Sequence, residues 1–154
     1  MPPQIVVGIP RVADVPGLRV RPGADGQLRA NHYTVMFLFL TDQLVSTYEC
    51  LLQFGTGNIM YDQTHEHHYR DVVGVSSFSK PLSRESSKEF ADAGIDGGIS
   101  LVHVFSLSIT NGAERMVNTG FGGPEARDDG KVAWHGNERV QSVVQRMIRS
   151  RHSK

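Results

Sequence analysis

Two periods of apolar residues divide the chain. Most of it carries short stretches that repeat every two residues, as β-strands do, whereas the C-terminal end repeats with the period of an α-helix. The segment 33–40 is apolar on both faces, which is typical of a strand covered on both sides. The segment 44–54 alternates and predicts a half-buried antiparallel strand. Its apolar face holds Tyr48, Cys50, Leu52 and Phe54.

Weaker strand patterns stand before and after this pair. The segment 4–9 is rich in β-branched residues and ends at Pro10, which cannot donate to a ladder. The segment 18–21 alternates and predicts an edge strand, which a turn rich in Pro and Gly follows. A further strand begins near residue 59 and runs into a histidine-rich segment.

Tyr69, Val72 and Val75 stand three residues apart, a spacing that a straight strand does not produce. It fits a tight turn at 70–71 that leads into a strand beginning at Val72. We therefore expect these three side chains in the core. The histidines just before Tyr69 are expected to face solvent or a partner.

Two later segments, 76–98 and 118–136, hold too many polar residues and glycines for core elements. We expect loops there, the first with a short helix within 83–93. Between them, 99–109 predicts a strand. An Asn-Gly pair follows this strand and predicts a hairpin to a return strand over 113–117, because both turn residues accept positive φ.

The C-terminal segment predicts an amphipathic helix that Asn137 caps. Its apolar positions recur at helical spacing and form one face. They are Val140, Val143, Val144, Met147 and Ile148. This face needs a sheet to cover, so the element order predicts a mainly β fold with a C-terminal helix.

Composition places this fold in a single domain, 1–154. The 16 basic and 16 acidic side chains give zero net charge, which argues against a nucleic-acid binder and favours self-association into a homo-oligomer. One cysteine, Cys50, permits no internal disulfide, and we expect it to be buried and inert. No signal-peptide pattern and no apolar run of about 20 residues is present, so we expect a cytoplasmic protein.

Three segments in order resemble patterns of bacterial pleckstrin-homology-like and GRAM-like domains. Residues 39–45 (Phe-Leu-Thr-Asp-Gln-Leu-Val) resemble their Leu-Thr-x-x-Arg-Leu hairpin, although Gln43 and Leu44 replace its Arg. Residues 69–75 resemble their Tyr-x-Asp-Ile-x-x-Val turn, and residues 105–112 resemble their late Phe-x-Leu hairpin that ends in Gly.

The resemblance covers residues 33–150 and leaves 1–32 as an N-terminal extension. It implies a pleckstrin-homology-like curved antiparallel sheet or barrel capped by one amphipathic α-helix. Such domains are usually binding or scaffolding modules, and the resemblance carries no catalytic residues.

The segment around His65, His67 and His68 is the sharpest chemical feature of the sequence. On a strand, His65 and His67 share one face, from which two imidazoles are able to bind one metal ion. A zinc site needs a third protein ligand, for which the candidates are His103, His135 and Asp62. The alternative is an exposed polar strand with ordinary histidines.

Basic residues near both ends form the second candidate site. They are Arg19, Arg21 and Arg29, together with Arg146, Arg149, Arg151 and Lys154. If the two ends adjoin, these side chains form a patch for anionic lipid headgroups. The alternative is solvated charge, with the C-terminal arginines compensating the helix dipole.

No nucleophile elbow, phosphate loop or zinc-protease pattern is present, so we expect neither an enzyme nor a cofactor. The leading hypothesis is a binding or scaffolding module that acts through protein–protein contact or self-assembly. The alternatives are a peripheral lipid-binding domain on an anionic membrane surface, and a metal-binding protein or metal-dependent enzyme built on His65, His67 and His68.

Overall fold

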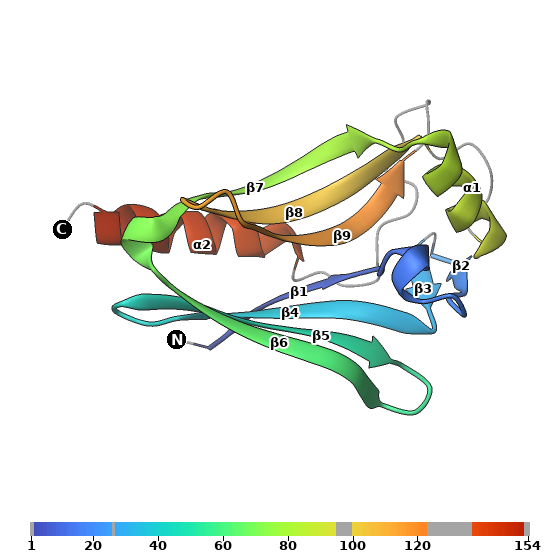
Figure 1. The fold of residues 1–154 in the computed structure, drawn as a ribbon, viewed down its shortest axis with the longest axis horizontal. Coiled ribbons are helices and arrows are strands. Elements are labelled where there is room, and N and C mark those ends of the chain that lie inside the picture. The colour runs from blue at the N-terminus through green and yellow to red at the C-terminus, as the bar shows by residue number, and fades with distance from the viewer. Residues whose placement is uncertain (1, 26, 95–99, 123–136, 153–154) are drawn as a thin grey trace.

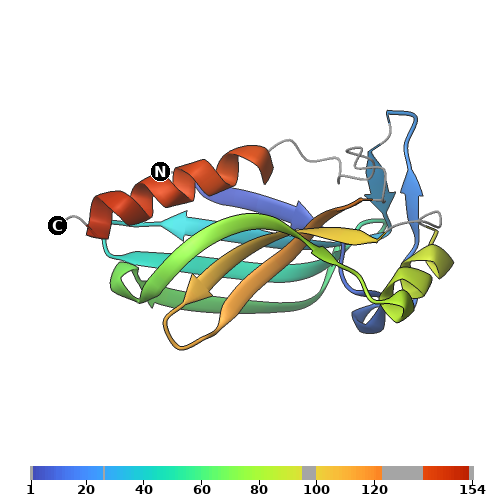
Figure 2. The ribbon, with the colours of Figure 1, turned by 90° about the horizontal axis from the view of Figure 1, so that it is seen from above.

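Two antiparallel sheets that face each other form the frame of the protein (Figure 1, Figure 2). The computed structural model describes residues 2–25, 27–94, 100–122 and 137–152. Apolar side chains from both sheets fill the space between them. These side chains form the main core of the protein.

The four-stranded sheet has the order β1-β4-β5-β6. Its strands are β1 (Gln4–Gly8), β4 (His32–Leu40), β5 (Leu44–Gln53) and β6 (Asn58–His68). All neighbours in it run antiparallel. The turn between β4 and β5 is held by Thr41, whose Oγ1 accepts the backbone N–H of Leu44 at 3.0 Å.

The three-stranded sheet has the order β7-β8-β9, again antiparallel. Its strands are β7 (Val72–Pro81), β8 (Leu101–Ile109) and β9 (Glu114–Gly122). A separate hairpin consists of β2 (Val20–Pro22) and β3 (Leu28–Ala30). Short 3-10 helices precede β2 and β7, namely η1 (Val12–Asp14) and η2 (Tyr69–Asp71).

Helix α2 (Asn137–His152) covers one side of the frame, where it packs against β1, β7 and η2 (Figure 1). Its apolar face buries Val140, Val144 and Ile148 in the main core. Five apolar residues along one face suit this role, because each buried side chain contributes about 1.5–3 kcal/mol. The Gln145 side chain also donates to the carbonyl oxygen of Val75 on β7 at 3.3 Å.

A second apolar cluster lies at the other end of the frame, where helix α1 (Arg84–Asp92) meets the β2–β3 hairpin. The rings of Phe90 on α1 and Phe121 on β9 lie 4.6 Å apart at its centre. Ser83 caps α1 by accepting the backbone N–H of Ser86.

The two sheets meet where the end of β1 passes β9. Ile9 donates its backbone N–H to the carbonyl oxygen of Asn118 at 2.9 Å. A Cβ atom on Gly8 would overlap that same carbonyl and the side chain of Val117. Only glycine therefore lets the two backbones approach this closely.

The mainly antiparallel β architecture with a C-terminal helix is confirmed, but the sheets do not close into a barrel. Tyr69, Val72 and Val75 are confirmed as core residues, with exposed fractions of 5%, 0% and 6%. Cys50 is buried as expected, and this burial raises the pKa of its thiol. Residues 1–32, expected as an extension, contribute β1 to the four-stranded sheet and Val6 to the core.

Two expected loops prove to be partly strand. Residues 76–81 form the second half of β7, and residues 118–122 form the end of β9. Pairing with β8 gives both segments backbone partners on one side, so their polar and glycine residues need no apolar pattern. The short helix expected within 83–93 is α1, whereas residues 95–99 and 123–136 lie outside the described part of the chain.

The apolar alternation of β5 marks the face opposite to the one in the core. Val45 and Leu51 belong to the core clusters, whereas Tyr48 and Leu52 remain half-buried on the outer face. The reason is that the inward face of β5 carries Thr47 and Glu49 between its two core residues, because it also lines a cleft between the sheets, so its apolar pattern is weaker than that of the outer face.

Tyr69 tests the packing of η2. Its ring is buried and its hydroxyl donates to the carbonyl oxygen of Thr41 at 2.8 Å. We expect Tyr69→Ala to lower the free energy of unfolding by about 3–5 kcal/mol, and Tyr69→Phe by about 0.5–1.5 kcal/mol. Urea denaturation measures both. The exposed neighbour is the control, with His68→Ala expected within about 0.5 kcal/mol of the wild type; an equal loss in Tyr69→Ala and His68→Ala would contradict this packing.

Gly8 tests the crossing of the sheets. We expect Gly8→Ala to lower the free energy of unfolding by about 1–3 kcal/mol, because the added methyl overpacks the contact with β9. Gly74→Ala is the matched control, since a Cβ there meets nothing within 4 Å, and we expect it to change stability by less than about 1 kcal/mol. Thermal or urea unfolding of the two variants measures both changes. Similar losses of stability in Gly8→Ala and Gly74→Ala would show that β1 and β9 do not cross closely.

Candidate functional site

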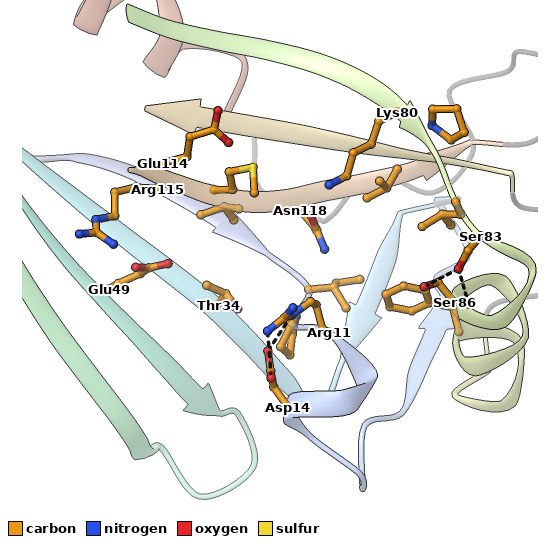
Figure 3. A pocket seen from close by; sticks show the side chains of 18 of the residues that line it. Arg11, Asp14, Thr34, Glu49, Lys80, Ser83, Ser86, Glu114, Arg115 and Asn118 are labelled. Carbon is orange, nitrogen blue, oxygen red and sulfur yellow. Dashed lines mark hydrogen bonds and ion pairs between the residues drawn. The ribbon is translucent and has the colours of Figure 1, made fainter. Parts of the chain in front are cut away.

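A cleft of about 570 Å³ opens between the two sheets, lined from both of them and from the end of the frame that holds α1 (Figure 3). One wall is β9, from Glu114 to Asn118. The opposite wall comes from β4, β5 and β6, through Thr34, Glu49 and Gln63. The remaining wall comes from the segments around η1 and the start of α1.

The charges that line the cleft balance. The cations are Arg11, Lys80 and Arg115, and the carboxylates are Asp14, Glu49 and Glu114. Arg11 and Asp14 form an ion pair at 3.0 Å, and Gln63 donates to Glu49 at 2.8 Å. A surface of this kind suits a ligand that offers both donors and acceptors, as a polypeptide does.

Tyr61 on β6 adds a hydroxyl to the cleft. Burial raises the pKa of Tyr61, and the carboxylates of Asp14 and Glu49 raise it further. The phenol is therefore neutral at physiological pH and retains its proton as a hydrogen-bond donor.

A side-chain bond joins β6 to β9 at the inner end of the cleft. The Arg115 guanidinium lies 2.9 Å from Nδ1 of His65. Because guanidinium is only a donor, Nδ1 accepts, and the ring proton of neutral His65 lies on Nε2, 3.4 Å from the Gln63 side-chain oxygen. The ring of His67 lies parallel to that of His65 with the centroids 6.2 Å apart.

The interior behind this bond holds polar atoms without partners. In the described part of the chain four buried side-chain atoms have no hydrogen-bond partner: Arg151 Nε at the end of α2, and Thr47 Oγ1, His67 Nε2 and Arg115 Nε here. Burial lowers the pKa of His67, and the neighbouring Arg115 and His65 lower it further. His67 is therefore held in its neutral form.

The structure brings together two of the three histidines proposed as metal ligands. His65 and His67 share the inner face of β6, whereas His68 is exposed on the other face. Asp62 accepts from Tyr48 on that outer face, and His103 lies on β8, bonded to Ser79. Within the described residues no group of three His, Cys, Asp or Glu side chains is placed to hold a metal, and His135 lies outside them. The geometry therefore gives the metal hypothesis no support.

The basic residues proposed as a lipid patch lie at opposite ends of the frame. Arg19 and Arg21 belong to the β2 end, and Arg146 and Arg149 belong to the C-terminal half of α2 (Figure 1). Arg29 pairs with Asp25, which holds the pKa of that carboxyl down at about 2. The N-terminal and C-terminal arginines therefore do not adjoin. Lys154 lies outside the described residues.

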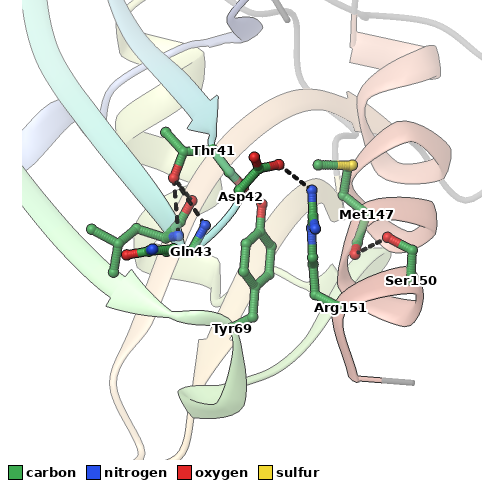
Figure 4. Close-up of polar contacts among 8 residues, drawn as sticks. Thr41, Asp42, Gln43, Tyr69, Met147, Ser150 and Arg151 are labelled. Atoms are coloured by element: carbon green, nitrogen blue, oxygen red, sulfur yellow. Dashed lines mark hydrogen bonds and ion pairs between the residues drawn. The ribbon is translucent and has the colours of Figure 1, made fainter. Parts of the chain in front are cut away.

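Arg151 has a structural contact instead. It pairs with Asp42 in the β4–β5 turn, beside the hydroxyl of Tyr69 (Figure 4). The pair joins the last turn of α2 to the turn that Thr41 holds. A partly exposed pair of this kind contributes little stability, about 0–1 kcal/mol.

Sequence reasoning missed most of the cleft. Its residues come from eight elements and from the two connections β1–η1 and β7–α1, and no local spacing links Arg11, Lys80 and Arg115. The only signal in the sequence was the histidine-rich segment, which does lie beside the cleft through His65.

Comparisons of the chain with protein-family models, with curated proteins and with solved structures find no match. Within the described residues, no helix has the length and apolar character needed to span a membrane.

The lowered pKa of His67 predicts acid sensitivity. In the unfolded chain this imidazole returns to its ordinary value of 6.5 and binds a proton more readily than in the folded protein. Keeping His67 neutral therefore costs no stability at a pH above 6.5. The free energy of unfolding falls as the pH decreases below this value, because the unfolded chain then binds a proton that the folded protein binds less readily. Urea unfolding at about pH 7.5 and about pH 5.5 measures the loss.

His67→Gln should reduce this dependence on pH, and the exposed neighbour supplies the control, since His68→Gln should leave it as in the wild type. An unchanged pH dependence in His67→Gln would show that His67 does not carry the effect.

Proposed function

We propose that the protein is a non-enzymatic binding module of pleckstrin-homology-like architecture, which acts by holding a protein partner in the cleft between its sheets. The cleft is the observation that carries the proposal. It lies on a side of the frame that α2 leaves open, and it offers charged and polar groups of both signs.

The architecture supports the same reading. Where the resemblance lies, antiparallel strands β4 to β9 are followed by the C-terminal helix α2, which is the order that the resembling segments imply. The cleft carboxylates of Asp14 and Glu49 are already bonded to Arg11 and Gln63, as in a binding surface. The separation of the arginines leaves the lipid-binding alternative without a patch, so we do not propose it.

Blocking the cleft tests the proposal. Ser86 on α1 lines the cleft, and its backbone bond to the Ser83 cap does not depend on its own side chain. Ser86→Trp should therefore fill the cleft without unfolding α1. Affinity capture from the native host should recover a partner with the wild type and lose at least about nine-tenths of it with this variant, an effect equal to a tenfold weaker affinity.

Ser142→Trp is the matched control, because it places the same side chain on an exposed position of α2. It should recover the partner as the wild type does. Equal recovery of the partner with both variants would show that partners do not use the cleft. Equal loss of the partner with both variants would show that binding does not depend on the cleft alone and involves α2.

A further inference from the structure

The wall of the cleft formed by β9 is the edge of the three-stranded sheet. Among the strands of the described residues, the order β7-β8-β9 leaves β9 paired on one side only, and its other side faces the four-stranded sheet (Figure 1). An edge strand presents backbone N–H and C=O groups that are able to pair with another chain. Which residues present them follows from the register.

The hairpin between β8 and β9 sets the alternation. Ile109 donates its N–H to the carbonyl oxygen of Ala113 at 2.9 Å. The next pairs are Leu107 with Arg115 and Phe105 with Val117. In an antiparallel ladder, residues that exchange hydrogen bonds alternate with residues that do not. The backbone groups of Arg115 and Val117 therefore point toward β8.

The backbone groups of Glu114, Met116 and Asn118 consequently point away from β8 toward the cleft. An independent bond confirms this direction, since the Asn118 carbonyl accepts from Ile9 across that edge. The chain then leaves the edge for η1, which begins at Val12. Among the described residues, the segment at Ile9 thus occupies the edge at Asn118.

The next two edge residues have no such partner. Among the described residues, neither Glu114 nor Met116 shares a backbone hydrogen bond with a neighbour on the cleft side. Their side chains are exposed, and 41% of Met116 is accessible. Four backbone groups, an apolar side chain and a carboxylate therefore lie in a row along the cleft wall.

We propose that the partner enters the cleft as an extended peptide segment, which adds a strand to β9 at Glu114 and Met116. This inference rests on the proposed function and names the partner's chemistry. Opposite residues of paired strands share a face, so the segment carries an apolar residue opposite Met116 and a basic residue, two positions away, opposite Glu114. Backbone pairing supplies affinity, and these two side chains supply selectivity.

The probe is a phage-displayed library of random octapeptides, selected on the full chain. The most enriched peptide is then synthesised in two forms, one normal and one N-methylated at alternate amides with every side chain kept. We expect the methylated form to bind at least about tenfold more weakly, because methylation removes the backbone bonds.

Met116→Pro tests the same bonds from the protein side, since it removes an edge N–H that β8 does not use. We expect an affinity loss of at least about tenfold, whereas Met116→Leu, which keeps the N–H and the apolar side chain, stays within about twofold. If Met116→Pro fails to fold, the comparison of the methylated and normal peptides on the wild type tests the same backbone bonds.

Equal binding of the methylated and normal peptides would overturn strand addition, and so would a library without enriched peptides. Light scattering tests a second outcome. A dimer of the wild type that Met116→Pro converts to a monomer would show that the edge of β9 binds a second copy of this chain instead of a peptide. If strand addition fails while Ser86→Trp still loses its native partner, the cleft remains the binding site and this inference alone falls.

Discussion

The crossing of β1 over β9 is the constraint on which the rest of the structure depends. Gly8 lets the two backbones approach, and the Ile9–Asn118 bond fixes their position. The two sheets therefore meet at this crossing as well as at η2, which joins β6 to β7 (Figure 1). Between these two places the interior needs a cover, and α2 covers the side at β1 and β7. The cleft is the side that remains.

The cleft owes its chemistry to the same geometry. At the inner end, β6 and β9 are far enough apart to need long side chains between them, and Arg115 reaches His65 there. In the interior behind this bond, burial and the nearby Arg115 lower the pKa of His67 and so favour its neutral form. On either side of Arg115, the free edge of β9 faces the cleft with the backbone groups of Glu114 and Met116. A frame closed into a barrel would have paired these groups and removed the site.

The parts of the fold that local spacing controls were predictable from the sequence. The turn before Val72, the hairpin after Ile109 and the helix from Asn137 each follow from a few adjacent residues. Burial of Tyr69 followed from the same spacing.

The parts that register controls were not predictable. Val45 lies inside after the turn that Thr41 holds, although the opposite face of β5 is the more apolar one, so alternation pointed to the wrong face. The polar half of β7 forms a strand only because β8 pairs with it. The cleft depends on contacts between distant segments, and the sequence pointed to it only through His65 beside its inner end.

Amide hydrogen exchange of the free protein, measured residue by residue with NMR, tests most directly whether the β9 edge is open. An open edge predicts alternation along this strand. The amides of Arg115 and Val117 bond to β8 and should exchange slowly, whereas those of Glu114 and Met116 face the cleft and should exchange fast. Slow exchange at all four amides would contradict the account, because it would mean that another segment already occupies the edge.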